Sequence, residues 1–136
     1  MTVVIIAIVL AVIVILRSEP GCSFGVSELI ELSSIEGRTK YLAGYGWEID
    51  KSSEEVTTVL LPKRPDAVML QYIELQTKQG YDLGSYCGLE CRRYSYEVTN
   101  YPSDSTVYAV LFIKNGRAIG GDIHSAEFDG FMHGIR

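Results

Sequence analysis

The first sixteen residues of the chain form an apolar run that does not suit a core folded in water. Residues 1–16 contain no charged side chain, and Thr2 is their only polar one. As a helix, this run would be about 24 Å long, somewhat short of the roughly 30 Å of hydrocarbon in a bilayer. Because a helix in lipid satisfies its own backbone polar groups, we expect a single-pass transmembrane anchor here.

Other interpretations of this run stay open. It could be the h-region of a cleaved signal peptide, although no A-x-A site follows, or a buried strand, although no alternation interrupts it. A lipoprotein site at Cys22 would have a suitable Gly21 before it, but Glu19 and Pro20 do not suit the preceding positions. The nearby Arg17 follows the run, on the wrong side for an exported domain under the positive-inside rule. No Lys or Arg precedes the run, which suggests that the true start lies upstream and includes a basic n-region.

The rest of the chain divides into a linker and one domain. Residues 17–27 contain Pro, Gly and Ser without a hydrophobic period, as is typical of a linker. We place the linker at residues 17–32 and a globular domain at residues 33–136. A domain of this length is sufficient for one modest core.

Charge and cysteine content exclude several classes of protein. The net charge is −5, which disfavours nucleic acid as a partner because an acidic surface repels phosphate. The three cysteines are too few for a disulfide scaffold, and Cys87 and Cys91 form a CxxxC spacing rather than the CxxC of redox and zinc sites. A local bridge between these two stays open if the domain faces an oxidising space. Nothing in the sequence indicates a cofactor.

Periodicity predicts two helices and two early strands. The first helix lies within residues 28–45, at least from Ser34, and the second runs from the cap at Asp66 to Gly80. Short strands are expected at residues 47–50 and 56–61.

A three-stranded meander is expected after the second helix. Residues 93–99 alternate between polar and apolar side chains, and residues 107–113 are apolar throughout, which predicts a central strand covered on both faces. Asn115-Gly116 predicts a type I′ turn into a returning strand at residues 117–124. The fold class is therefore α+β: behind the anchor, a mainly antiparallel sheet of four or five strands with two packed helices.

The predicted two-residue loop also fixes the register of this hairpin. It pairs Phe112 with Ile119, Val110 with Gly121, Tyr108 with Ile123, Leu111 with Gly120, Ala109 with Asp122, and Val107 with His124. Adjacent glycines in a strand indicate a bulge or a close approach by a packed side chain, for which Tyr108, Phe112 and Trp47 are candidates.

Four tracts of the sequence resemble one bacterial family. They are Lys40-Tyr-Leu-Ala-Gly-Tyr-Gly-Trp47-Glu, Gln79-Gly-Tyr-Asp-Leu83, Arg93-Tyr-Ser-Tyr-Glu-Val-Thr-Asn-Tyr-Pro102, and Gly120-Gly-Asp122 through Phe131-Met-His133-Gly134. Together they are similar to domain-of-unknown-function family 4830, over roughly residues 33–134. The resemblance implies a small domain behind an N-terminal membrane segment in Gram-positive-type bacteria. It implies no activity and no catalytic residue.

Two groups of side chains are candidates for a functional site. Asp122, His124 and His133, with Glu127 and Asp129, are residue types that bind metals, and Asp122 and His124 share a strand face because they are two apart. Their spacing matches no known ligand motif. Tyrosine often lines recognition surfaces, which makes Tyr94, Tyr96 and Tyr101 a candidate binding surface; the alternative is a core with a wet rim.

No motif for a catalytic nucleophile or a phosphate loop accompanies these groups. We therefore expect a membrane-tethered, extracytoplasmic interaction or binding domain without catalytic activity, whose protein partner the sequence does not identify. The alternative is a small metal-dependent enzyme or metal sensor that uses the C-terminal His/Asp/Glu cluster.

Overall fold

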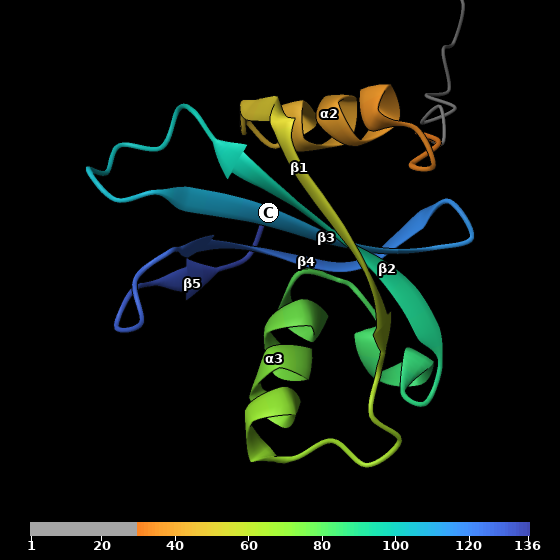
Figure 1. Cartoon of the computed structure of the whole chain (residues 1–136). Helices are drawn as coiled ribbons and strands as arrows, with labels where there is room; N and C mark the ends of the chain where they lie inside the picture. Colours follow the sequence, from red (N-terminus) through yellow and green to blue (C-terminus); the bar gives the residue numbers. More distant parts are fainter. Residues whose placement is uncertain (1–29) are drawn as a thin grey trace, which may run out of the picture.

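Two helices and a five-stranded antiparallel sheet make up the part of the chain that the structure, a computed structural model, describes, residues 30–136. In chain order the elements are α2 (Ile35–Gly44), β1 (Ile49–Leu60), α3 (Ala67–Lys78), the 3-10 turn η1 (Leu83–Tyr86), β2 (Glu90–Val98), β3 (Val107–Lys114), β4 (Arg117–Ser125) and β5 (Met132–His133). Strands neighbour one another in sequence order, with α2 on one face and α3 on the other (Figure 1). The predicted α+β class is confirmed.

The predicted anchor at residues 1–16 lies outside the described residues. Within residues 30–136, no helix is long and apolar enough to cross a membrane. Leu32, placed in the linker by the sequence, is buried, and its N–H donates to the carbonyl oxygen of Gly116 at 3.1 Å. The folded domain therefore includes the last residues of that predicted linker.

Polar side chains begin both helices. The Ser34 hydroxyl accepts from the Gly37 N–H at 3.1 Å, and the Asp66 carboxylate accepts from the Met69 N–H at 2.8 Å. These contacts satisfy backbone donors that the first turn of a helix leaves without a partner. The predicted start at Ser34 and the predicted cap at Asp66 are both confirmed.

Where two short strands were predicted, the structure has the single long strand β1. Its pairing with β2 shifts between Asp50 and Glu55, so that residues 51–54 lie opposite Tyr96 alone. The Asp50 carboxylate accepts from the Ser52 N–H at 2.9 Å, and the Ser53 hydroxyl donates to the Asp50 carbonyl. These local bonds hold the extra residues in a bulge rather than in a turn that would divide the strand.

The hairpin turn forms as predicted, but the register beyond it does not. Asn115 and Gly116 have φ values of 52° and 73°, as a type I′ turn requires. Ile113 pairs with Ala118, yet the next pair is Phe112 with Gly120, which leaves Ile119 as an extra residue.

This bulge shifts every later pair by one residue, so the predicted pairs from Phe112 onward were wrong. Asp122 lies opposite Val110 and His124 lies opposite Tyr108. The side chains of Asp122 and His124 therefore lie on the face of the sheet that α3 covers.

β3 is the central strand, as predicted, and separates two cores. The α2-side core contains Leu32, Leu42, Tyr94, Tyr96, Val98, Val107, Ala109, Leu111, Ile113, Ile123 and Ile135. The α3-side core contains Leu61, Leu83, Cys91, Val110, Phe112 and Ile119. Cys91 is not bonded to Cys87, so the bridge that the sequence left open is not formed.

Two glutamines attach the end of α3 to β4. The Gln76 side-chain oxygen accepts from the Gly121 N–H at 2.8 Å, while the Gln79 amide donates to the Gly121 carbonyl at 3.0 Å. The Gln79 side-chain oxygen also accepts from the Ile135 N–H at 2.6 Å. Because β5 pairs with β4 only at Ile123 and His124, the two amides fill the part of the β4 edge that no other strand of residues 30–136 covers.

The adjacent glycines Gly120 and Gly121 leave room for the segments that pack on β4. A Cβ atom at Gly121 would lie 2.3 Å from Ile135 Cδ1 and 2.6 Å from the Val110 carbonyl oxygen, and one at Gly120 would lie 3.3 Å from Gln76 Oε1. The sequence predicted a bulge or a close approach, and both are present. The approaching side chains, however, are Gln76 and Ile135 rather than an aromatic residue.

Candidate functional site

The C-terminal cluster that suggested a metal site is not assembled. Asp122 and His124 lie on the α3 face of the sheet, whereas His133 pairs with Ile123 and lies on the α2 face. The Glu127 carboxylate instead accepts from the Ser105 hydroxyl at 2.6 Å. Among residues 30–136, no group of three or more His, Cys, Asp or Glu side chains is placed to hold a metal ion.

His133 belongs to an aromatic stack at the end of the α2-side core. Its ring lies 5.8 Å from that of Phe131 at an interplanar angle of 14°, and its Nε2 is 2.9 Å from the Tyr101 hydroxyl. Tyr101 in turn stacks on Trp47, whose Nε1–H donates to the Ile135 carbonyl at 2.8 Å. Both ring nitrogens of His133 have partners, because Nδ1 is 2.7 Å from the Gly134 carbonyl oxygen.

The three tyrosines considered as a binding surface do not form one. Tyr94 and Tyr96 are 6% and 0% exposed, and both pack in the α2-side core. The Arg38 guanidinium lies 3.9 Å from the centre of the Tyr94 ring and donates to the Tyr96 hydroxyl at 2.6 Å. Of these three tyrosines, only Tyr101, which belongs to the stack described above, is partly exposed.

Asp122 is the centre of a polar site on the α3 face. One carboxylate oxygen is 2.6 Å from His124 Nδ1, and the other accepts from the Tyr72 hydroxyl at 2.5 Å. The Asp122 side chain is 4% exposed and that of His124 is 22% exposed. Strand alternation thus places Asp122 and His124 on one face of β4, and α3 brings Tyr72, 50 residues from Asp122 in the sequence, to the same place.

Electrostatics keep Tyr72 as the donor in this site. Burial raises the pKa of the Tyr72 phenol far above its ordinary value, and the Asp122 carboxylate raises it further. Arg93 acts in the opposite direction on the same pKa. A buried carboxylate needs hydrogen-bond donors, and the Tyr72 phenol and the imidazole provide one for each oxygen.

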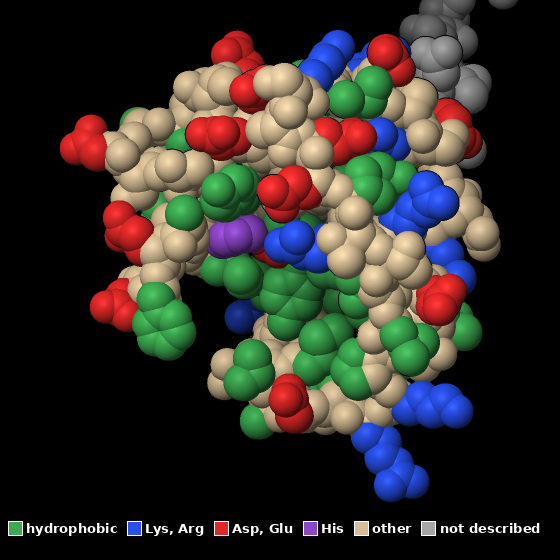
Figure 2. Space-filling view, in the orientation of Figure 1, with side chains coloured by type: hydrophobic (Ala, Val, Ile, Leu, Met, Phe, Trp, Pro, Cys, Tyr) green, Lys and Arg blue, Asp and Glu red, His purple; other side chains and the backbone are tan. Residues whose placement is uncertain are grey.

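The site leaves one edge of the imidazole available. In the part of the chain that the structure describes, His124 Nε2 has no hydrogen-bond partner, while Asp122 orients the ring through Nδ1. The Tyr108 ring lies 5.7 Å from that of His124, and Met132, directly across from His124 on β5, is 51% exposed. Between the sheet and α3, Figure 2 shows a hollowed surface where hydrophobic side chains lie beside charged ones.

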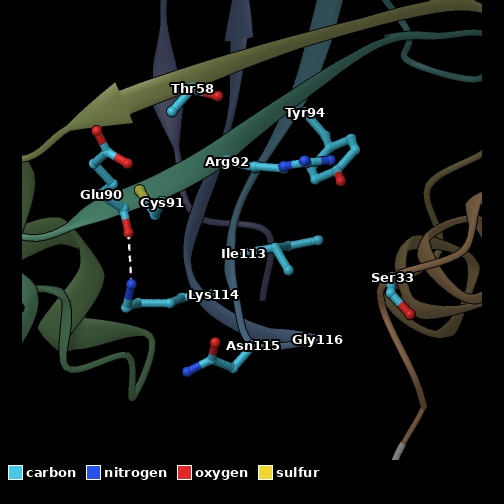
Figure 3. Close-up of a pocket in the computed structure, with 10 residues that line it drawn as sticks. All are labelled: Ser33, Thr58, Glu90, Cys91, Arg92, Tyr94, Ile113, Lys114, Asn115 and Gly116. Carbon is cyan, nitrogen blue, oxygen red and sulfur yellow. Dashed lines mark hydrogen bonds between the residues drawn. The ribbon is translucent and has the colours of Figure 1, made fainter.

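Two further hollows, neither of them expected from the sequence, lie at the hairpin end of the domain. One, of about 450 Å³, lies between Ser33 and β2–β3, and there the Lys114 ammonium donates to the Glu90 carbonyl at 2.8 Å (Figure 3). The other, of about 820 Å³, contains Tyr81 and the Arg136 guanidinium, 4.6 Å from that ring. In the second hollow, the Arg136 guanidinium donates to the Gln79 carbonyl at 2.6 Å, and the Tyr81 hydroxyl is hydrogen-bonded to that of Tyr41, so these groups have partners within the protein.

Sequence reasoning identified Asp122 and His124 but missed Tyr72. Tyr72 lies within the second predicted helix, and its partner Asp122 is 50 residues away. Arg93 belongs to the polar half of the alternation at residues 93–99, and the structure shows that this half lies on the face toward α3. The buried position of Asp122 could have indicated that it needs a donor, but only the fold shows which one.

We expect Tyr72→Phe to lower the free energy of unfolding at neutral pH by about 1–3 kcal/mol, because Asp122 loses a hydrogen bond in a buried site. The raised pKa of Tyr72 also makes the stability of the protein depend on pH. Above about pH 10 the phenol ionises in the unfolded chain but not in the folded one, so stability falls as pH rises. In Tyr72→Phe, the fall in the free energy of unfolding above about pH 10 should be smaller than in the parent.

Denaturant unfolding from neutral to alkaline pH measures both effects. The pKa values of Tyr81 and Tyr96 are also raised by burial, so the variant keeps part of the decline. A variant with the parent's stability and the parent's alkaline slope would show that the Tyr72–Asp122 bond does not hold the site together.

The sequence model of one family matches residues 41–123, across β1 to β4 and including Tyr72 and Asp122. No curated protein and no solved structure matches the chain. The matched segment covers more than half of the 136 residues. The chain therefore belongs to the family described as domain of unknown function 4830 (DUF4830).

Proposed function

We propose that this protein is a membrane-tethered, extracytoplasmic binding domain that holds its partner at the face around His124 and catalyses no reaction. The observation that carries the proposal is the Asp122–His124 bond, which orients an imidazole on a face that α3 leaves partly open. An imidazole fixed in this way offers Nε2 as a hydrogen-bonding group at a defined position.

The surroundings of His124 favour binding over catalysis. Exposed Met132 and the Tyr108 ring provide apolar contact area beside the polar group, a combination that is common in recognition sites. Within residues 30–136, no Ser, Thr or Cys side chain is hydrogen-bonded to His124 as a nucleophile would be. Since His133 lies on the other face of the sheet, no observation favours a metal-dependent activity as a second proposal.

The placement of the site suits a tethered domain. Residue 30, where the described chain begins, lies at the hairpin end, because Leu32 bonds to Gly116. His124 lies toward the opposite end of β4, next to β5 (Figure 1). The face around His124 therefore lies at the end of the domain remote from residue 30.

The tether is tested by an alkaline carbonate wash of membranes that contain the full-length chain. We expect the protein to stay in the membrane pellet. The matched variant Val9→Arg, with a charge in the middle of the apolar run, should be extracted, because a central arginine costs roughly 2.5–3.5 kcal/mol of insertion free energy. A shortened soluble product of the parent chain would favour a cleaved signal peptide instead.

The binding face is tested by photo-crosslinking of the full-length chain in membranes of its own source. A photoreactive amino acid replaces Met132 or, as a control, Leu70 on the outer side of α3; the two residues are 51% and 53% exposed. We expect Met132 to yield a discrete adduct that Leu70 does not, and His124→Ala to reduce its yield. Equal labelling at both positions, or labelling indifferent to His124→Ala, would contradict the proposal.

A further inference from the structure

The outer edge of β1 is an uncovered strand edge. β1 is the first strand in the order β1-β2-β3-β4-β5, so among residues 30–136 it has a strand neighbour on one side only. It crosses the front of the molecule between α2 and α3, with no helix or loop in front of it (Figure 1). An uncovered edge offers rows of backbone donors and acceptors to another strand.

The pairing of β1 with β2 shows which groups face outward. Leu61, just after β1, donates its N–H to Leu89 at 3.0 Å and accepts from the Gly88 N–H at 2.8 Å, so its backbone groups point toward β2. Antiparallel pairing alternates along a strand. The N–H and C=O groups of the even-numbered Val56, Thr58 and Leu60 therefore point outward, and no partner for them occurs within residues 30–136.

This half of β1 has none of the usual protections of an edge. Residues 56–60, Val-Thr-Thr-Val-Leu, contain no charge and no proline, and they pair with β2 without a bulge. Val56 and Leu60 are 47% and 65% exposed and lie on the same face of the strand. Proteins usually protect such an edge with lysine, proline or a bulge. β4, by contrast, has its edge filled by Gln76 and Gln79.

The charges on either side of this neutral run are complementary to a second copy of the chain. Exposed Glu55 precedes the run, and exposed Lys63 and Arg64 follow it. An antiparallel second copy reverses this order, so each Glu55 approaches the Lys63-Arg64 pair of the other copy. A parallel copy would instead set Glu55 beside Glu55, and like charges in neighbouring strands are destabilising.

We propose that β1 pairs with β1 of a second copy, antiparallel about a two-fold axis near Thr58. The pair joins five strands from each copy into one continuous sheet. Val56 of each copy then lies against Leu60 of the other, which covers both exposed side chains. Such an interface is isologous and closes at two copies, so it leaves no free β1 edge for further growth. The proposal is independent of the face around His124.

The test is the mass of the full-length chain in detergent, measured by sedimentation equilibrium over a range of concentrations. We expect a monomer–dimer equilibrium that Thr58→Pro abolishes. This substitution removes an outward N–H, so it spares the bonds from β1 to β2, and circular dichroism verifies that the variant is folded. A monomer at all concentrations would overturn the proposal. So would a dimer that persists in folded Thr58→Pro, since it would have to form elsewhere, for example through residues 1–16.

Charge reversal provides a second test that does not depend on proline. Glu55→Lys alone, and Lys63→Glu with Arg64→Glu, should each weaken the dimer by about tenfold, the effect of a few exposed ion pairs that become repulsive. All three substitutions in one chain restore the complementarity and should restore the parent's dissociation constant. If the triple variant is weaker than either partial one, the antiparallel arrangement is wrong.

Discussion

The structure depends on the contact of two buried glutamines with one glycine. Gln76 and Gln79 bond the N–H and C=O of Gly121 and so substitute for the strand that β4 lacks on that side. Gln79 also bonds Ile135, which brings the C-terminal segment onto the sheet. Buried amides are stabilising when they find partners, and the absence of a side chain at Gly120, where a Cβ atom would lie 3.3 Å from Gln76 Oε1, leaves room for the approach of Gln76. Within residues 30–136, the buried Gln76 Nε2 has no hydrogen-bond partner.

This contact has a direct consequence for the candidate site. Tyr72 lies one helical turn before Gln76, so fixing the end of α3 on β4 also places the Tyr72 hydroxyl on Asp122. Asp122 in turn orients His124. The position of α3 therefore determines the face that we propose as a binding surface. This face lies at the end of β4 remote from the hairpin. β1 forms the opposite edge of the sheet, so pairing of two copies leaves the face around His124 accessible in each copy.

Local signals in the sequence were sufficient for most of the secondary structure. The cap at Asp66, the apolar strand at residues 107–113 and the Asn115-Gly116 turn act over a few residues, and the structure confirms each of them. The bulge at Ile119 was missed because a two-residue turn fixes only the first pairs of a hairpin. β1 was divided in two for a similar reason: its polar middle looks like a turn until β2 is beside it.

The site could be predicted only in part, because its contacts join distant residues. Asp122 and His124 share a face through strand alternation alone, and that expectation is confirmed. Their bond partner on α3 is 50 residues from Asp122, and Gln76 is 45 residues from Gly121. Tyr94 and Tyr96 show the opposite error: their alternation was read correctly, but the face they share is covered by α2.

The most direct test of this account is the free energy of unfolding of Gly121→Ala, compared with that of Gly44→Ala. At Gly121 the new methyl group would lie 2.6 Å from the Val110 carbonyl oxygen, whereas at Gly44, in α2, nothing lies within 4 Å. We predict a loss of about 1–3 kcal/mol for Gly121→Ala and no loss for Gly44→Ala, measured by denaturant unfolding. If Gly121→Ala were as stable as the parent chain, the C-terminal segment that Gln79 bonds at Ile135 would not be packed on β4 as closely as described here.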